Sequence, residues 1–229
     1  MTSTAPEPTK RSVTLTRMAG TTQNRQGDAT RTRLVKTAER LFATQGVDAV
    51  SVRAVNAAAG QGPAAVHYHF GSKESLLTAV LLDLGASIRD QIGANVDALA
   101  SDPQAPTLDR VVRALTDPYL ELLLKHRVRG MRWVKIVVQV SREDRPAVTS
   151  TGQDELSLRL REQVRRALPD TDPVRIDRRW PIAVMSFLQS LSRIDDWAAN
   201  GAKVTQEDLV EYYEDLVSFV TGGAERMLG

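Results

Sequence analysis

The chain has 229 residues, of which 42% are hydrophobic and 25% are charged, a balance that is ordinary for a globular protein. It contains no cysteine, which excludes disulfides, thiolate zinc sites and cysteine nucleophiles and makes a reducing cytoplasm the expected location. The N-terminus has no apolar segment typical of a signal peptide. The longest uncharged apolar stretch, Trp180 to Ser192, has 13 residues, whereas a membrane span needs roughly 20, so we expect no membrane partner.

Charge is divided unevenly along the chain. The net charge is only +2, yet residues 1–75 hold ten basic and five acidic residues, a net charge of +5. Residues 76–229 carry a net charge of −3. A basic N-terminal third joined to an acidic remainder predicts a polyanionic partner for the first part of the chain.

Residues 1–27 lack hydrophobic periodicity and are rich in Thr, Ser, Pro and Gly. The basic residues Lys10, Arg11, Arg17 and Arg25 are scattered through them. This composition predicts a flexible basic arm. An inert tail is an equally good interpretation.

The first ordered helix is expected to begin at an N-cap, either Asp28 or Thr30. Apolar residues recur every three or four positions from Leu34 to Phe42, which predicts one buried helix face. Gly46 is expected to end this helix. This helix is the first element of a domain that we place at residues 28–75.

Two shorter helices follow. Ser51 is expected to cap the second helix, and Gly60 is well placed for a left-handed residue after its end. A very short third helix is predicted from Pro63 to Phe70, and Ser72 is expected to cap a fourth. A helix, a glycine turn and a short helix, preceded by a supporting helix, are the arrangement of a helix-turn-helix, whose second helix enters the major groove of DNA.

The third helix has side chains that suit this task. Val66 and Phe70 lie four positions apart and are expected to face the core. The outward residues are then Ala64, Ala65, His67 and Tyr68, with His69 on the flank. Alanine methyls can contact thymine methyls, while histidine and tyrosine can hydrogen-bond to phosphates or base edges.

Two basic residues beside this helix are further candidates for DNA contact. Lys73 stands in the first turn of the fourth helix, where it opposes the positive end of the helix dipole unless a phosphate binds there. Arg53, near the start of the second helix, could reach a base or the backbone. Both could equally be solvated surface charges.

Residues 76–229 are also expected to be helical and to form a second domain. The predicted helices are Leu108 to Lys125, Trp133 to Val140, Asp154 to Leu168, Val174 to Ala199 and Gln206 to Met227. No segment shows sustained alternation of apolar and polar residues, so the fold class is all-α. Gly85 and Gly93, in the helix that links the two domains, either soften that helix or mark close packing.

One apolar stripe in this second domain has three interpretations. It consists of Trp180, Val184, Phe187, Leu191 and Ile194. Core or dimer seam is the favoured interpretation, and the wall of a ligand pocket is the third. Trp133 and Phe187 are the candidate residues for binding an apolar ligand.

The stretch from Thr32 to Val80 resembles the DNA-binding domain of the tetracycline-repressor (TetR) family. The resemblance is carried by LFATQG, by SVRAV at the start of the second helix, by the AAG turn and by HYHFGSKESLL. It implies an all-α homodimer in which the first three helices bind DNA and the others form a ligand pocket and the dimer interface, with the last two long helices forming a four-helix seam. By position, it implies DNA contacts at Arg53, Ala65, His67, Tyr68, His69 and Lys73.

The chain departs from this family at the start of the third helix. The family often has a Ser/Thr-Lys pair there, whereas this chain has Gly62-Pro63, and Ala65 stands where Thr or Ser is common. A base-contacting lysine is thus missing, and specificity is expected to depend more on van der Waals contact and DNA shape. The resemblance predicts a repressor that binds a near-palindromic operator as a homodimer and is released by a small, apolar effector.

Other classes of protein fit less well. His67 and His69 lie about 200° apart on a helix, so they cannot grip one metal ion, and no metal or other cofactor is expected. The sequence has no P-loop, no GxSxG and no HExxH, so we expect no enzyme. The alternatives are a regulator of lipid or acyl-thioester metabolism rather than of drug efflux, or a helical enzyme or adaptor with an N-terminal interaction module. An architectural DNA-binding protein would not need the additional helical domain.

Overall fold

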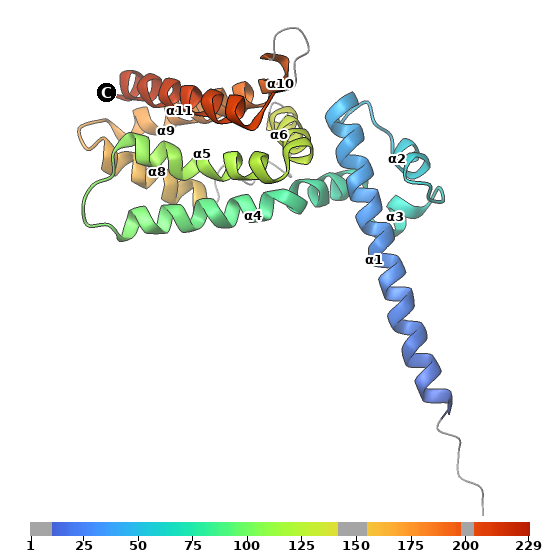
Figure 1. The fold of residues 1–229 in the computed structure, drawn as a ribbon. Coiled ribbons are helices and arrows are strands. Elements are labelled where there is room, and N and C mark those ends of the chain that lie inside the picture. Colours follow the sequence, from blue (N-terminus) through green and yellow to red (C-terminus); the bar gives the residue numbers. More distant parts are fainter. Residues whose placement is uncertain (1–10, 142–154, 198–203) are drawn as a thin grey trace, which may run out of the picture.

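The computed structural model describes residues 11–141, 155–197 and 204–229, and every regular element in these ranges is an α-helix. The helices form a small N-terminal body and a larger C-terminal bundle, which lie side by side (Figure 1). This arrangement confirms the predicted all-α fold, with an N-terminal helix-turn-helix and a helical C-terminal domain.

The N-terminal body contains three helices, as predicted: α1 (Arg11–Gln45), α2 (Val52–Ala58) and α3 (Ala65–Phe70). The third helix is shorter than expected, because Pro63 and Ala64 form a turn before it. Gly46 has a φ of +89° and ends α1, which is the left-handed conformation that glycine adopts without strain.

The start of α1 differs from the prediction. The helix begins at Arg11, well before Asp28, so the expectation of a flexible arm over residues 1–27 is wrong for residues 11–27. Residues 1–10 lie outside the described residues. The stretch contains no proline, and a glycine inside a helix costs only about 1 kcal/mol relative to alanine, so its two glycines do not end the helix. Figure 1 shows this part of α1 projecting beyond the rest of the molecule.

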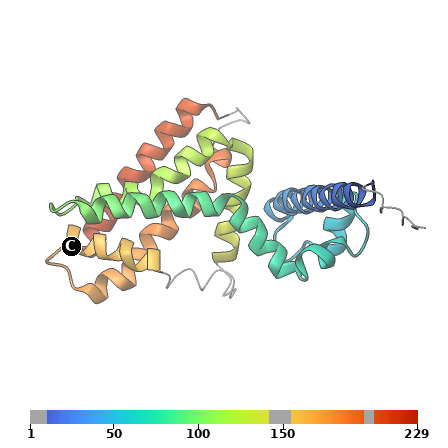
Figure 2. The ribbon, with the colours of Figure 1, turned by 90° about the horizontal axis from the view of Figure 1, so that it is seen from below.

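The C-terminal bundle is built from the remaining helices. They are α4 (Lys73–Ser101), α5 (Leu108–Lys125), α6 (Arg127–Ser141), α8 (Glu155–Ala167), α9 (Pro173–Leu191), α10 (Ile194–Trp197) and α11 (Gln206–Leu228). In Figure 2, α4 crosses from the N-terminal body along the whole bundle. The expected domain boundary at residue 75 therefore falls inside one continuous helix.

Two of the predicted helices differ in extent. The helix expected from Trp133 begins earlier, at Arg127. The long helix expected over residues 174–199 divides into α9 and α10 at Ser192, whose hydroxyl donates to a backbone carbonyl three residues earlier at 2.7 Å. Local competition of this kind between a side chain and the helix hydrogen bonds ends helices.

The buried residues form two clusters. The N-terminal core joins α1, α2 and α3 to the first turns of α4, and it includes Phe42, Val66 and Leu77. The C-terminal core holds most of the bundle's apolar side chains. Helix α6 contributes to both, because Ile136 and Val140 lie in the N-terminal core while its other buried apolar residues lie in the C-terminal one.

The apolar stripe of α9 and α10 lies in the C-terminal core. Trp180, Phe187, Leu191 and Ile194 are all buried within the protomer, and Val184 is half-buried. The four buried side chains are therefore core, whereas Val184 lines an apolar cavity of the bundle. The stripe cannot also be a dimer seam, because the same side chains already pack inside the bundle, where α9 lies against α11.

Candidate nucleic-acid interface and an apolar cavity

The helix-turn-helix is fixed by short-range hydrogen bonds. Ser51 caps α2, and its side chain accepts from the Ala54 N–H at 3.1 Å. Gly60 follows α2 with a φ of +64°. Ser72 caps α4 and accepts from the Ser75 N–H at 3.0 Å. These caps and the left-handed glycine confirm the boundaries that the sequence predicts.

Asn56 holds α3 against α2, and the sequence analysis did not single it out. Its side chain is only 2% exposed. Its amide nitrogen donates to the Pro63 carbonyl at 2.6 Å, and its amide oxygen accepts from the Val66 N–H at 3.0 Å. A polar residue on the apolar face of a short helix, one turn before Gly60, is the signal that could have revealed it.

The outward face of α3 is largely open to solvent. Ala64 and His67 are exposed, and Tyr68 is 84% exposed. Ala65 differs from the expectation: it is half-buried and packs against the N-terminal core, because it lies on the same side of α3 as His69, which is half-buried as well. The exposed tyrosine is the largest apolar surface on this helix.

The two histidines of α3 have different surroundings. The His67 ring Nδ1 lies 2.8 Å from the Gly71 carbonyl oxygen, which can only accept, so Nδ1 carries the proton. Nε2 of the neutral ring is therefore left as an acceptor. His69 is half-buried on the flank, as expected, and its ring packs edge-on against Tyr68 with 5.0 Å between centroids.

Basic side chains lie on both sides of α3. Arg53 is exposed in the first turn of α2. Lys73 begins α4, and its ammonium donates to the Asp48 carbonyl at 3.2 Å, which gives it an internal partner at the helix N-terminus. Arg31, which the sequence analysis did not single out, stacks its guanidinium over the Phe70 ring at 5.1 Å. The exposed helix α3 therefore carries neutral and aromatic side chains and is flanked by basic side chains from α1, α2 and α4.

An apolar cavity of about 390 Å³ lies in the C-terminal bundle. Its walls come from α4, α5, α6, α8 and α9, and most of them are aliphatic. The described residues that line its inner part include Ile88, Ile92, Tyr119, Trp133 and Leu188. This volume lies toward the lower end of the range for sites that bind small molecules.

The two predicted ligand residues have different positions. Trp133 lines the cavity, and its indole N–H donates to the Leu81 carbonyl at 2.9 Å. Phe187 is not among the described residues that line the cavity, so the structure does not support it as a ligand contact. Phe187 is fully buried, and its ring packs against Tyr119. The side of α9 that faces the cavity carries Met185 instead.

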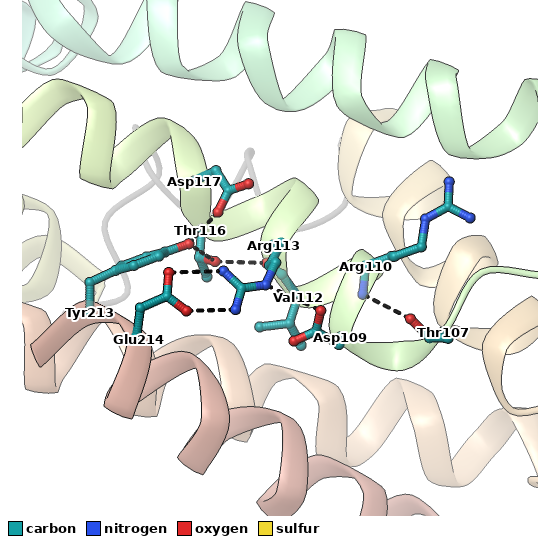
Figure 3. A network of polar contacts seen from close by, with 9 residues as sticks. All are labelled: Thr107, Asp109, Arg110, Val112, Arg113, Thr116, Asp117, Tyr213 and Glu214. Carbon is teal, nitrogen blue, oxygen red and sulfur yellow. Dashed lines mark hydrogen bonds and ion pairs between the residues drawn. The ribbon is translucent and has the colours of Figure 1, made fainter. Parts of the chain in front are cut away.

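A polar network joins α5 to α11 beside this aromatic cluster (Figure 3). The buried Tyr213 hydroxyl lies 2.8 Å from the Thr116 hydroxyl and donates to the Asp117 carboxylate. Arg113 makes two hydrogen bonds to Glu214, at 2.7 and 3.2 Å, which hold the pKa of Glu214 below its usual range. The network fixes α11 across the bundle.

A second set of charges joins the two bodies. Glu39 on α1 is 3% exposed and accepts two hydrogen bonds from Arg129 on α6, at 2.7 and 3.0 Å. The same guanidinium donates to Asp83 on α4 at 2.6 Å. In addition, Gln139 of α6 accepts from the Val47 N–H at 3.3 Å. Helix α6 therefore contacts both the cavity and the helix-turn-helix body.

Two further findings concern the part of the chain that the structure describes. It contains no group of three or more His, Cys, Asp or Glu side chains placed to hold a metal ion. None of its helices combines the length and the apolar character needed to cross a bilayer.

Comparison with known proteins shows two family matches. Residues 34–80 match the family described as bacterial regulatory proteins, tetR family, and residues 113–223 match a tetracyclin repressor-like C-terminal domain. A curated relative, the HTH-type transcriptional regulator BetI of Rhizobium meliloti (strain 1021), is 40% identical over 68 residues. That match covers 30% of this chain and 34% of BetI, so it spans about a third of the relative's length.

Solved structures share the fold at low sequence identity. The TetR family regulator PfmR from Thermus thermophilus is 21% identical with a TM-score of 0.53, and the match covers 81% of this chain and 97% of PfmR. AibR, in complex with isovaleryl coenzyme A and operator DNA, is 18% identical with a TM-score of 0.53, covering 83% of this chain and 97% of AibR. The two family matches together span well over half of the chain. The solved structures have the same fold, so the two kinds of comparison agree.

Proposed function

The chain belongs to the TetR family of transcriptional regulators, and we propose that it is a ligand-responsive repressor that binds a near-palindromic operator as a homodimer. A small, predominantly apolar effector would release it from the DNA. The proposal places the protein in the cytoplasm, where operator DNA is found.

The exposed face of α3 carries the proposal for DNA binding. Tyr68 is 84% exposed on a helix whose opposite face is anchored by Val66 and by Asn56. A rigidly held helix with a large exposed side chain fits insertion into a groove. Lys73 and Arg53 would contact phosphates on either side.

A homodimer follows from the length of DNA that one helix can read. Two half-sites about 34–36 Å apart require two copies of α3 related by symmetry. The outer faces of α9 and α11 support a seam, because they carry the exposed apolar side chains Ile182 and Phe219, the latter 71% exposed. Gly222 and Gly223 on α11 have no described atom within 4 Å of an added Cβ, so a partner helix could approach closely there.

Release of DNA would use differential affinity for two conformations. An effector shifts the population only as far as it binds one conformation better, and a coupling of about 1–3 kcal/mol is typical. Helix α6 supports such coupling, because Trp133 lines the cavity while Ile136 packs in the N-terminal core. That the related fold of AibR holds both isovaleryl coenzyme A and operator DNA is consistent with the proposal.

Selection of DNA from a random pool tests the proposal. The purified protein should enrich a near-palindrome whose half-sites are centred about one helical turn apart. Tyr68→Ala should weaken operator binding by roughly ten-fold or more, since one good base contact contributes about 1–3 kcal/mol of discrimination. Leu158→Ala, which removes an exposed apolar side chain on α8, is the matched control and should leave operator affinity unchanged.

Lys73→Ala distinguishes backbone contact from base contact in the same assay. If Lys73 binds a phosphate, its loss should weaken operator and random DNA alike and reduce the salt slope by about one. An asymmetric selected sequence bound by a monomer, or equal affinity of the Tyr68→Ala and wild-type proteins, would contradict the proposal.

A further inference from the structure

The inner part of the apolar cavity has one polar group that is not used by the protein. Tyr119 lines the cavity from α5 and is 8% exposed. Its ring packs between Trp133, at 6.1 Å between centroids, and Phe187, at 5.6 Å. No residue in the described part of the chain forms a hydrogen bond with its hydroxyl. The fully enclosed unpaired atoms of the described residues do not include this hydroxyl, so it stays open to the cavity, where water or a bound molecule can accept a hydrogen bond from it.

The other polar residues of the wall are already paired or lie nearer the surface. The Trp133 N–H is bonded to a backbone carbonyl, and the Thr78 hydroxyl donates to the Glu74 carbonyl at 3.0 Å. Ser141 is exposed. Arg89 is exposed as well, and both Arg89 and the half-buried Ser157 have interactions of their own. The Tyr119 hydroxyl is therefore the buried polar side-chain group of the wall that has no partner among the described residues.

Tyr213 provides the contrast within the same aromatic row. Its ring packs edge-on against Phe187, with 6.3 Å between centroids, but its hydroxyl is bonded to Thr116 and Asp117. Tyr213 does not line the cavity in the described structure. Of these two buried tyrosines, which both pack against Phe187, Tyr213 uses its hydroxyl to join α5 to α11, whereas the Tyr119 hydroxyl has no such partner in the described residues.

We propose that the effector is a neutral, predominantly apolar molecule with one hydrogen-bond-accepting oxygen, and that the Tyr119 hydroxyl binds this oxygen. The inference rests on the proposed function, because it treats the cavity as the effector site. It adds the chemical class of the effector and the residue that selects it.

The charge of the site agrees with a neutral ligand. Burial raises the pKa of Tyr119 to about 12, so the phenol stays protonated at neutral pH and donates. A carboxylate would need a cation at the same depth, and the described wall offers only Arg89, at its exposed edge. Burial of an unpaired anion is far more costly than burial of a carbonyl group.

Three small probes of similar shape test the inference on the full-length protein without DNA. Butyrophenone has a ketone oxygen, butylbenzene has no oxygen, and 4-phenylbutyrate is an anion at neutral pH. Tyr119→Phe keeps the ring and removes only the hydroxyl. It should weaken butyrophenone binding by about five- to ten-fold and leave butylbenzene binding within about two-fold, as measured by calorimetric titration.

Tyr213→Phe is the matched control. It should leave the affinity for all three probes unchanged while lowering the unfolding temperature, whereas Tyr119→Phe should leave that temperature unchanged or raise it. Equal butyrophenone affinity in the wild type and Tyr119→Phe would overturn the role of Tyr119, and tighter binding of 4-phenylbutyrate than of butyrophenone would overturn the neutral class. If no probe binds, the cavity is not the effector site, while the selected operator independently tests DNA binding.

Discussion

The two bodies of the molecule are specified by contacts of very different range along the chain. In the helix-turn-helix, the hydrogen bonds of Asn56 span seven and ten residues, and the caps at Ser51 and Ser72 span three. In the bundle, the contact from Trp133 to Leu81 spans 52 residues and that from Arg113 to Glu214 spans 101. The turn between α2 and α3 is therefore specified by local sequence, whereas the bundle depends on how distant helices meet. Helix α6 also completes the N-terminal core with Ile136 and Val140.

The difference has a functional counterpart. A DNA-binding helix must keep one geometry, and the local hydrogen bonds of Asn56 hold α3 against α2. The shape of an effector cavity must be able to change between conformations. Apolar packing between helices that are distant in the sequence permits such a change, because it is not directional. Helix α6 is where the two kinds of structure meet, because it lines the cavity and also contacts α1.

The largest effect is expected where the two bodies are joined. Arg129→Met would leave the Glu39 carboxylate, which is 3% exposed, with only the Arg132 guanidinium at 3.8 Å. Breaking a buried ion pair from one side costs about 3–5 kcal/mol, and we expect about 3 kcal/mol because Arg129 is partly exposed. Urea unfolding monitored by circular dichroism measures this loss.

The control for this prediction lies on the same helix. Arg127 pairs with Asp195 at 2.8 Å, but the Asp195 side chain is 45% exposed, so Arg127→Met strands no buried carboxylate and should cost less than about 1 kcal/mol. Adding Glu39→Gln to Arg129→Met should restore much of the lost stability, since no buried charge then remains. Equal losses for the two arginine variants would show that the bodies are not joined through Glu39.

The range of these contacts also explains what the sequence could predict. Ser51, Gly60 and Ser72 were assigned correctly because caps and left-handed glycines depend on a few neighbouring residues. The start of α1 was misplaced, because nothing local ends a helix between Arg11 and Asp28. The role of the α9 stripe stayed open for the opposite reason: whether an apolar face meets its own bundle or a second chain is decided by distant residues.

The same reasoning applies to the candidate sites. Tyr68 could be placed on the outer face of α3 from helix periodicity alone. Phe187 and Tyr119 could not be told apart, because both are aromatic residues on amphipathic helices, and only the crossing of α5 and α9 decides which one faces the cavity. Asn56 could have been found from its polar side chain among apolar neighbours.

The second prediction tests how local the helix-turn-helix is. Asn56→Ala removes both hydrogen bonds and leaves the Pro63 carbonyl and the Val66 N–H without this partner. We expect a loss of about 2 kcal/mol in the free energy of unfolding, since buried unpaired groups cost about 1–3 kcal/mol each and some will be reached by water. Operator binding should fall strongly in an anisotropy assay, because α3 loses its support, while butyrophenone binding should persist.

Asn95 supplies the matched asparagine in the other body. Its side chain donates to the Ala114 carbonyl at 3.1 Å and ties α4 to α5. Asn95→Ala should cost about 1 kcal/mol and leave operator affinity unchanged. Should Asn56→Ala keep wild-type operator affinity, or Asn95→Ala lose it, the division between a locally fixed DNA-binding body and a separate bundle would be refuted.

The smallest effects are expected from two glycines of α4, the helix that runs through both bodies. A Cβ at Gly85 would lie 2.8 Å from Cζ2 of Trp133, whereas one at Gly93 would meet no described atom within 4 Å. Replacing a helix glycine by alanine gains about 1 kcal/mol, and forcing extra volume into a packed site costs about 1–3 kcal/mol. The indole at Gly85 cannot turn away freely, because its N–H is bonded to the Leu81 carbonyl.

Gly85→Ala should therefore lower the free energy of unfolding by about 1 kcal/mol, and Gly93→Ala should raise it by up to about 1 kcal/mol. Thermal unfolding of the two single variants, each compared with the wild type, measures both signs. Because the displaced indole of Trp133 lines the cavity, Gly85→Ala should also weaken butyrophenone binding, whereas Gly93→Ala should not. If both alanines stabilise the protein equally, Gly85 is not a close-packing position. A softer helix would then be the remaining reason for its glycine, and the rigidified Gly85→Ala protein should show a smaller change in operator affinity when butyrophenone is added.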